Sequence, residues 1–392
     1  MSVRRRIMVV GAGRGQMGLY AAAHRMGLVT IAAGLDGDYP GLAVADEKCF
    51  VNITRPAEVV AAAKSLNIDA VVTSCMDTGV EALGAVNDAL GFRGISQEVA
   101  RSSFDKVLQK RALLDAGVPV ADCVISKGEP RDLDEAEVRL GYPLVLKKRH
   151  SQSSNGVFVV NDRLQAESVL EREFRDEDEF LIEEYLQGDE FGAQACVVDG
   201  DIRFVMLHGD LLFQSHAPIP VGHFCPVNLT EDRAEIARDA AIKAIRASDF
   251  DNCAVNMDFK MSGNEVRVME LTGRAGANGL PELVGMNYGI DYYESIIRVA
   301  LGLPVTFSDS DAPNATLAKM ILPDRDGTLS AVSLKPIDPQ VFEVQAFRSA
   351  GSHVNRYESA NDCIGQVSVM GESVEFCEAL ADRQAASSFL IQ

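Results

Sequence analysis

Residues 142–149 read Tyr-Pro-Leu-Val-Leu-Lys-Lys-Arg, and residues 151–156 read Ser-Gln-Ser-Ser-Asn-Gly. The apolar part of the first stretch is typical of a buried strand, and three adjacent cations end it. Backbone amides and hydroxyls of a short polar loop after such a strand can wrap phosphate groups. Because the chain carries a formal net charge of -20, three adjacent cations before this loop favour phosphate binding over an ordinary solvated basic loop.

Three further segments carry side chains that suit a nucleoside triphosphate and its cations. Lys106 lies in the first turn of a predicted helix, where a cation is unfavourable unless an anion is near. Glu183 and Glu190 can accept hydrogen bonds from an adenine amino group and from ribose hydroxyls. Asp258 and Glu270 lie on the two strands of a predicted hairpin, and such hard oxygen ligands suit Mg²⁺.

Arg274 follows Glu270 by four residues in the stretch 270–276, Glu-Leu-Thr-Gly-Arg-Ala-Gly. An arginine beside a metal site commonly clamps a carboxylate or a developing oxyanion. A structural ion pair between Arg274 and a carboxylate is the alternative. Read singly, the segments around Lys106 and Glu183 are equally typical of a solvated surface, so the order of the four segments carries the prediction.

The rest of the chain indicates several domains, as its 392 residues require. The first hundred residues alternate strand and helix patterns, which predicts a parallel sheet with crossover helices. Ser102 or Ser103 is expected to cap a helix that runs to about Ala116. From about Ala121 the pattern changes to short strands between acidic helices, a mixed α+β region. After a linker at residues 308–313, the remainder is expected to be a small strand-rich domain.

Taken in this order, the segments resemble the ATP-grasp superfamily, specifically the carboxylate-amine ligases. The resemblance implies an α/β fold in three parts: an N-terminal Rossmann-like domain at 1–102, an ATP-grasp domain at 103–305 and a C-terminal domain at 306–392. A lid subdomain would span about 120–185. The implied reaction uses ATP with Mg²⁺, or with Mn²⁺ in its place, to phosphorylate a carboxylate. An amine then attacks the acyl phosphate, and ADP and phosphate are released.

The resemblance also implies roles for single residues. Arg274 and Lys147 would be catalytic. The residues implied to hold ATP are Lys106, Lys147, Ser153, Ser154, Gly156, Glu183, Glu184, Leu186 and Glu190. The metal ligands would be Asp258, Glu270 and Thr272, and Thr272 stands where the family often has Asn. Lys148 and Gln152 likewise replace a usual proline and a usual glycine.

Substrate residues are expected in the first domain's loops and between Leu207 and Val227. Asp77 and Glu81, predicted one helical turn apart, could bind an amine or be solvated. His216 and Gly276 are further candidates for substrate contact. His208, His216 and His223 match no zinc-site spacing, so substrate contact or plain loop histidines are favoured over a metal cluster.

Two other classes of function remain open. The glycine-rich turn at residues 11–18, with Asp36 after the next strand, has elements of a dinucleotide site and would suit an NAD-dependent dehydrogenase. However, Gln16 replaces the third glycine, so the turn is as well explained as a tight strand-to-helix connection that faces a substrate's anionic group. The third class is a catalytically silent ATP-binding regulator.

Composition limits the partners and the location. The acidic balance argues against nucleic acid, which needs a basic surface, and no apolar run reaches the roughly 20 residues that span a bilayer. The eight scattered cysteines are expected to be small buried hydrophobes in a reducing compartment. We therefore expect a cytoplasmic protein that acts on a small-molecule carboxylate and a small-molecule amine, as a monomer or a homodimer.

Overall fold

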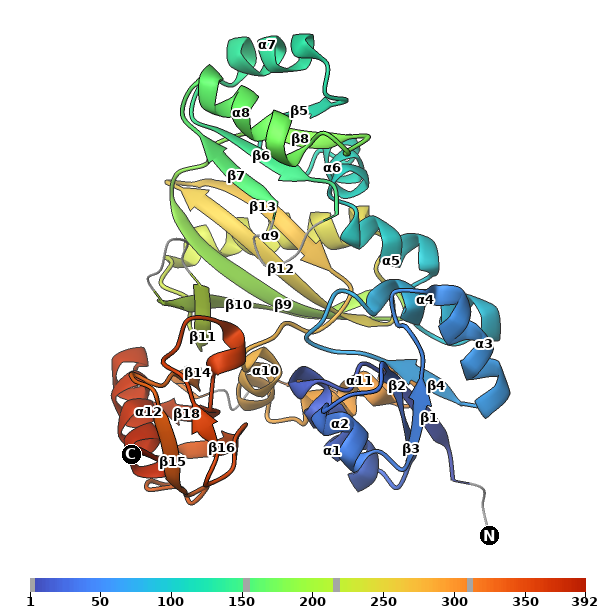
Figure 1. Ribbon diagram of the computed structural model, residues 1–392, viewed down its shortest axis with the longest axis vertical. Helices are drawn as coiled ribbons and strands as arrows, with labels where there is room; N and C mark the ends of the chain where they lie inside the picture. The colour runs from blue at the N-terminus through green and yellow to red at the C-terminus, as the bar shows by residue number, and fades with distance from the viewer. Residues whose placement is uncertain (1–3, 151–155, 214–218, 309–312) are drawn as a thin grey trace.

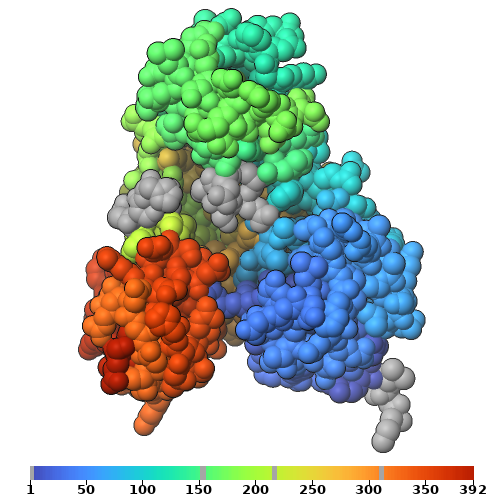
Figure 2. All heavy atoms as spheres, viewed as in Figure 1, coloured from blue at the N-terminus to red at the C-terminus, as the bar shows by residue number. Residues whose placement is uncertain are grey.

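The computed structural model describes residues 4–150, 156–213, 219–308 and 313–392. Ser153 and Ser154 of the predicted phosphate loop, Gln152 and His216 therefore lie outside the described residues. Figures 1 and 2 show three bodies: an N-terminal unit in blue, an upper unit in green and a C-terminal unit in red. The long strands of a central sheet run between them.

A parallel sheet forms the N-terminal unit, as the sequence predicts. Its strand order is β3-β2-β1-β4, and helices cover both faces. This double cover explains why residues 7–10 of β1 are all fully buried. The strands are β1 (Arg6–Val10), β2 (Val29–Gly34), β3 (Glu47–Phe50) and β4 (Ala70–Val72). The helical segments are η1 (Arg14–Gln16), α1 (Met17–Arg25), α2 (Pro40–Val44), α3 (Pro56–Leu66) and α4 (Val80–Leu90).

Two helices, not one, follow this unit. α5 spans Gln97–Phe104 and α6 spans Lys106–Asp115. The prediction that Ser102 or Ser103 caps a helix is wrong: Ser96 caps α5, and Asp105 caps α6 by accepting from the amides of Val107 and Leu108 at 3.0 Å. Asp105 is the stronger cap because its backbone is extended, whereas both serines lie inside α5.

The upper unit is a four-stranded antiparallel sheet in the order β5-β8-β6-β7, with α7 and α8 packed on it. Its register pairs Val145 with Glu183 and Lys147 with Leu181. Lys147 and Glu183 are thus diagonal neighbours, which long side chains can bridge. The elements are β5 (Cys123–Ser126), α7 (Pro130–Arg139), β6 (Leu144–Lys148), β7 (Val157–Val160), α8 (Arg163–Glu173) and β8 (Phe180–Glu184).

The central sheet has eight antiparallel strands in the order β13-β12-β9-β10-β11-β14-β18-β16. The alanine-rich helix α9 (Glu231–Ala247) packs against residues such as Val255 and Met257, so the alternate residues Asn256 and Asp258 lie on the opposite face. The strands are β9 (Asp189–Val198), β10 (Asp201–Phe213), β11 (Ile219–Cys225), β12 (Cys253–Ser262), β13 (Glu265–Thr272), β14 (Ala315–Ile321), β16 (Val341–Ala346) and β18 (Gly365–Gly371).

The C-terminal unit contains strands, as predicted, but three of them continue the central sheet. β14 pairs with β11 from Gly222 with Lys319 to Cys225 with Thr316. Helices α10 (Leu280–Tyr288) and α11 (Tyr292–Ala300) lie between the units, and Ile297 of α11 joins the N-terminal core. The remaining elements are β15 (Gly327–Val332), β17 (His353–Val354), η2 (Ala360–Asp362), α12 (Val374–Ser388) and β19 (Phe389–Ile391).

Candidate functional site

A row of paired residues crosses the central sheet on the face opposite α9. Glu270 pairs with Asp258, Asp258 with Gly192, and Gly192 with His208. The two carboxylates are directly opposite each other on a hairpin, where like charges destabilise one another unless a cation lies between them. The sequence prediction that these two strands form a hairpin is confirmed.

The charges around Asp258 fit a divalent cation. Desolvation by the surrounding protein and the negative charges of Glu270 and Asp210 raise the pKa of Asp258 to about 7. The Asp258 side chain is exposed on the sheet face, where a cation can reach it. A bound cation would offset the repulsion between the carboxylates, which is one cause of the raised pKa of Asp258. Thr272 lies on the same strand as Glu270, and its buried Oγ1 has no hydrogen-bond partner among the described residues. These oxygens form a donor set suited to Mg²⁺.

Lys106 and Arg149 surround the same carboxylates. Lys106 Nζ lies 2.8 Å from Glu270 Oε1. The Lys106 amide donates to the carbonyl of Arg149, and Arg149 Nε contacts the second oxygen of Asp105 at 2.6 Å. Asp105 therefore caps α6 and fixes Arg149 at once, which holds Lys106 at the end of strand β6.

Glu183 lies in a buried cluster of charges. Its two carboxylate oxygens contact Lys110 Nζ at 2.8 Å and Lys147 Nζ at 2.6 Å, and its side chain is 3% exposed. Burial alone would raise the pKa of Glu183, but the charges of Lys147 and Lys110 outweigh it and lower that pKa. Glu183 therefore holds Lys147 in place, a task additional to the predicted adenine contact. Sequence reasoning missed Lys110, although its position one helical turn after Lys106 was a usable signal.

The other predicted nucleotide residues flank this cluster. Glu190 contacts Lys260 Nζ at 2.8 Å, and Lys260 also lies over the Tyr185 ring. Glu184 accepts from the backbone amide of Asp122 at 2.9 Å, so this oxygen braces strand β5. The Gly156 carbonyl accepts from the Lys148 amide at 2.9 Å, and Gly156 has a φ of +77° that disfavours other residues. Leu186 lies between Tyr185 and Glu190, at the end of β8.

Arg274 contacts a residue of the N-terminal unit. Its Nε and Nη2 lie 2.7 and 2.6 Å from Asp77 Oδ1. Asp77 precedes α4 and is not on a helical turn with Glu81, which instead contacts Arg101 Nη2 at 3.0 Å and Gln97 Nε2 at 3.1 Å of α5. The predicted geometry of an Asp77–Glu81 pair for an amine is therefore wrong, since α4 begins only at Val80.

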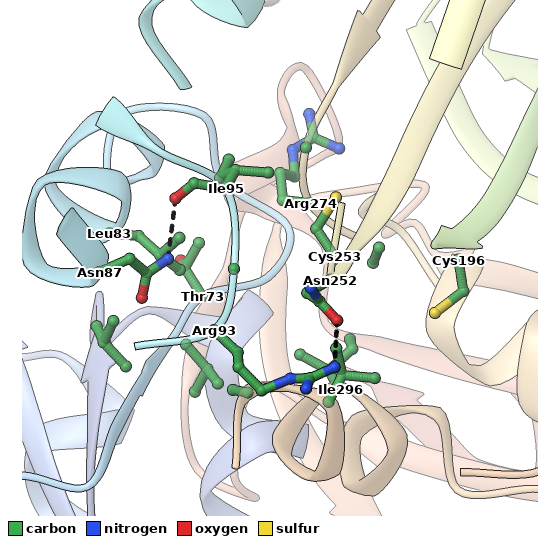
Figure 3. Close-up of a pocket in the computed structure, with 17 residues that line it drawn as sticks. Thr73, Leu83, Asn87, Arg93, Ile95, Cys196, Asn252, Cys253, Arg274 and Ile296 are labelled. Carbon is green, nitrogen blue, oxygen red and sulfur yellow. Dashed lines mark hydrogen bonds between the residues drawn. The ribbon is translucent and has the colours of Figure 1, made fainter. Parts of the chain in front are cut away.

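Arg274 lines a cavity of about 40 Å³, and Figure 3 shows the residues around it. Arg93 points toward Asn252 and bonds it at 2.7 Å, and Asn87 bonds the carbonyl of Ile95 at 3.0 Å. In the part of the chain that the structure describes, Asn87 Oδ1 and Arg93 Nε have no hydrogen-bond partner. The space suits a few ordered water molecules but is too small for a substrate.

Two histidines meet on strands β10 and β11. Asp210 Oδ1 contacts His208 Nδ1 at 3.2 Å and His223 Nδ1 at 2.7 Å. These atoms are close enough for a metal cluster, although the sequence spacing favoured plain histidines. Pairing of β10 with β11 joins them, which spacing along the chain does not reveal. His208 Nε2 is buried, has no hydrogen-bond partner within the described ranges, and lies above Gly192 on the side of Asp258.

Gln16 occupies polar groups of the glycine-rich turn. Gln16 Oε1 accepts from the Gly13 amide at 3.0 Å, and Gln16 Nε2 donates to the carbonyl of Ser74 at 2.6 Å. The side chain that replaces the third glycine therefore fills the turn from inside. Gly276, by contrast, lies at the centre of the site: its amide donates to Gln194 at 2.9 Å, and its carbonyl accepts from Cys75 at 3.0 Å.

Comparison with known proteins gives consistent results. The family model described as D-ala D-ala ligase C-terminus matches residues 113–276. A crystal structure described as phosphoribosylglycinamide synthetase from Anaerococcus prevotii is 34% identical, with 100% of each chain covered and a TM-score of 0.88. An L-amino acid ligase from Bacillus licheniformis has the same fold, at 18% identity, full coverage of both chains and a TM-score of 0.78. A formate-dependent phosphoribosylglycinamide formyltransferase from Prochlorococcus marinus is 23% identical over 86% of this chain and 88% of its own.

The fold and these relatives define the class as ATP-dependent ligases. The chain belongs to the ATP-grasp superfamily and, within it, to the carboxylate-amine ligase type. No relative supports the dehydrogenase alternative. Among the described residues, no helix is long and apolar enough to cross a membrane.

Proposed function

We propose that this protein activates a substrate carboxylate as an acyl phosphate and couples it to an amine, with ADP and phosphate as products. The observation that carries the proposal is the convergence of Asp258, Glu270, Lys106 and Arg274 on one side of the central sheet. The buried pair of Lys147 and Glu183 lies in the upper unit, and Lys147 is two residues before Arg149, whose carbonyl accepts from the Lys106 amide.

The acidic and the basic residues of the site have different proposed roles. Asp258 and Glu270, with Thr272 beside them, would hold Mg²⁺, which neutralises phosphate charge during phosphoryl transfer. Lys106 would leave Glu270 for the phosphates of ATP once the metal takes over that carboxylate, and Lys147 would contact them from the upper sheet. Glu183 and Leu186 would hold adenine, and Glu190 the ribose. Ser153, Ser154 and Gly156 would close over the phosphates.

The two steps follow from these positions. A carboxylate oxygen of the substrate attacks the γ-phosphorus, the bond to the ADP oxygen breaks, and an acyl phosphate forms. An amine then attacks the acyl carbon, and phosphate leaves. Arg274 would exchange its contact with Asp77 for the substrate oxygens and stabilise the oxyanion. Asp77, freed from Arg274, would be available to the amine.

The test is a product analysis with the full chain, ATP and a panel of amino acids, singly and in pairs. We expect ADP and phosphate in step with the ligated product, and hydroxylamine should trap the acyl phosphate as a hydroxamate. AMP in place of ADP would exclude this mechanism. ATP binding without turnover for any carboxylate would favour the silent regulator.

A further inference from the structure

Strands β10 and β11 carry two histidines and an aspartate that meet on one face of the central sheet. His208 and Asp210 are two residues apart on β10, so their side chains point to the same face. Asp210 pairs with His223 on β11. Figure 1 shows β11 where the central sheet continues into the C-terminal unit. The pairing of two strands therefore sets the relative positions of the three side chains.

The three side chains place possible metal-ligand atoms close together. Asp210 Oδ1 lies 3.2 Å from His208 Nδ1 and 2.7 Å from His223 Nδ1. The ligand atoms of the three residues all lie within 4.8 Å of one another. Two ligands that each lie about 2.0–2.1 Å from a tetrahedral ion are about 3.3 Å apart. Small shifts of these side chains would therefore place an ion between them.

The cluster is shielded from water and has little positive charge around it. The His208, His223 and Asp210 side chains are 2%, 7% and 16% exposed. Among the described residues, no lysine or arginine lies within ion-pair distance of Asp210, whose contacts are with the two imidazoles. On β14, the residue paired with His223 is the uncharged Ala318. Buried carboxylates are as a rule paired with a cation or bound to a metal, so either a protonated histidine or a metal ion is expected here.

The second nitrogen of His208 favours the metal ion. Nε2 is buried, has no hydrogen-bond partner in the described part of the chain, and lies where a Cβ on Gly192 would overlap it. Gly192 pairs directly with Asp258, and directly paired positions are about 4.5–5.5 Å apart at Cβ. Nε2 is therefore directed toward the strand that carries the Asp258 carboxylate. A histidine that binds a metal through one nitrogen almost always donates the other N–H to a carboxylate, a carbonyl or water.

We propose that His208, Asp210 and His223 bind a Zn²⁺ ion, separate from the Mg²⁺ proposed at Asp258 and Glu270. Two imidazole nitrogens suit zinc and its first-row neighbours, whereas Mg²⁺ prefers oxygen ligands. Three protein ligands leave a fourth position for water or another oxygen ligand. The ion would join β10 to β11 on the face that carries the proposed Mg²⁺ site. The proposal is independent of the ligase reaction, because metal binding alone tests it.

Zinc binding by the full chain tests the proposal. The chain is freed of metal with a chelator and titrated with Zn²⁺ in excess Mg²⁺, which occupies the proposed carboxylate site. We expect one equivalent of Zn²⁺ to remain after dialysis against metal-free buffer, and the bound ion to raise the Tm. X-ray absorption should show nitrogen or oxygen at about 2.0–2.1 Å from the zinc and no sulfur at about 2.3 Å, which excludes binding by cysteines. A chain that retains no zinc, or retains it on sulfur, would overturn the proposal.

Variants then assign the ligands, with folding checked by circular dichroism. His208→Gln, His223→Gln and Asp210→Asn should each weaken zinc binding by roughly a hundredfold or more, since loss of a mere hydrogen-bond partner of a metal ligand already costs about 10–100-fold. His24→Gln is the matched control, because His24 Nε2 contacts one carboxylate, Asp46, at 3.3 Å in a more exposed pair. It should bind zinc as the wild type does. Unchanged affinity in any folded ligand variant, or an equal loss in the control, would refute the assignment. If one variant fails to fold, the other two and the absorption spectrum of the wild type decide.

Discussion

At the scale of single residues, Glu183 shows how one carboxylate can fix two lysines in the proposed nucleotide site. It is buried and contacts two lysines, and an ion pair of this kind is costly to break because the remaining charges stay desolvated. We expect Glu183→Gln to lower the free energy of unfolding by about 3–5 kcal/mol and to weaken ATP binding through a displaced Lys147. Urea unfolding and ADP titration measure the two effects.

The same residue predicts a pH dependence. The folded-state pKa of Glu183 is lowered, so its stabilisation is complete above its unfolded pKa of about 4.3. It is lost as the pH falls through the lower folded value. Below about pH 4 the wild type should therefore lose stability more steeply than Glu183→Gln. Parallel curves for the two proteins would show that Glu183 is not charged in the fold.

Asp258 and Glu270 predict a metal requirement. Asp258→Asn and Glu270→Gln should each abolish most turnover, because each removes an anionic ligand from Mg²⁺. The metal-free Asp258→Asn protein should be at least as stable as the wild type at pH 8, since it loses a carboxylate whose pKa the fold raises to about 7. Glu265→Gln, on the same hairpin but exposed, is the control. Wild-type rates for either variant at limiting Mg²⁺ would remove that residue from the metal site.

Arg274 predicts a separation of binding from chemistry. Arg274→Lys keeps the charge but loses the planar fork that matches two oxygens. The ligation rate should fall by roughly a hundredfold or more, while ADP affinity changes little because the residues proposed to hold adenine and ribose lie elsewhere. Arg267→Lys on β13 serves as the matched control. If Arg274→Lys ligates at the normal rate, the role of Arg274 is limited to its ion pair with Asp77.

At the scale of elements, strand β9 has a glycine, Gly192, where the neighbouring strands leave no space for a side chain. A Cβ on Gly192 would lie 2.3 Å from His208 Cε1 and 3.0 Å from the carbonyl of Met257. His208 cannot swing aside freely, because it is buried and its Nδ1 contacts Asp210. We expect Gly192→Ala to cost about 1–3 kcal/mol of stability and to lower turnover, as measured by thermal unfolding and ADP release.

Adding His208→Ala to Gly192→Ala makes this prediction specific. The smaller side chain removes the clash, so the double variant should be less destabilised than the sum of the two single changes. Additive losses would mean that Gly192 is needed for its backbone alone.

The elements also show what the sequence could predict. Local signals were sufficient for the alternating strands and helices of the first hundred residues, which form the predicted parallel sheet. They failed at the cap of α6, where Asp105 is better placed than Ser103. The cluster of Lys110, Glu183 and Lys147 depends on contacts between a helix and two strands that are far apart in the sequence. The pattern of apolar and polar residues along a short segment does not reveal such contacts.

At the scale of the whole molecule, the central sheet binds the parts together. Five of its strands precede α10 in the sequence, but β14, β18 and β16 come from the last eighty residues, and they extend the same ladder through β11. Leu211 and Phe224 of β10 and β11 pack against the C-terminal core. The proposed division at residue 306 therefore cuts through a continuous sheet, and we expect the C-terminal part not to behave as an independent domain.

This continuity predicts the outcome of truncation. A chain that ends at residue 305 would leave β11 as an open edge and uncover Leu211 and Phe224, so it should aggregate or lose its cooperative transition. A chain that ends at residue 388 loses only β19, which pairs with β15 outside the central sheet, and should remain soluble. Calorimetry of the full chain should show the central sheet and C-terminal unit unfolding together. Soluble, separately folded fragments 1–305 and 306–392, each with its own transition, would show that the sheet is two domains in contact.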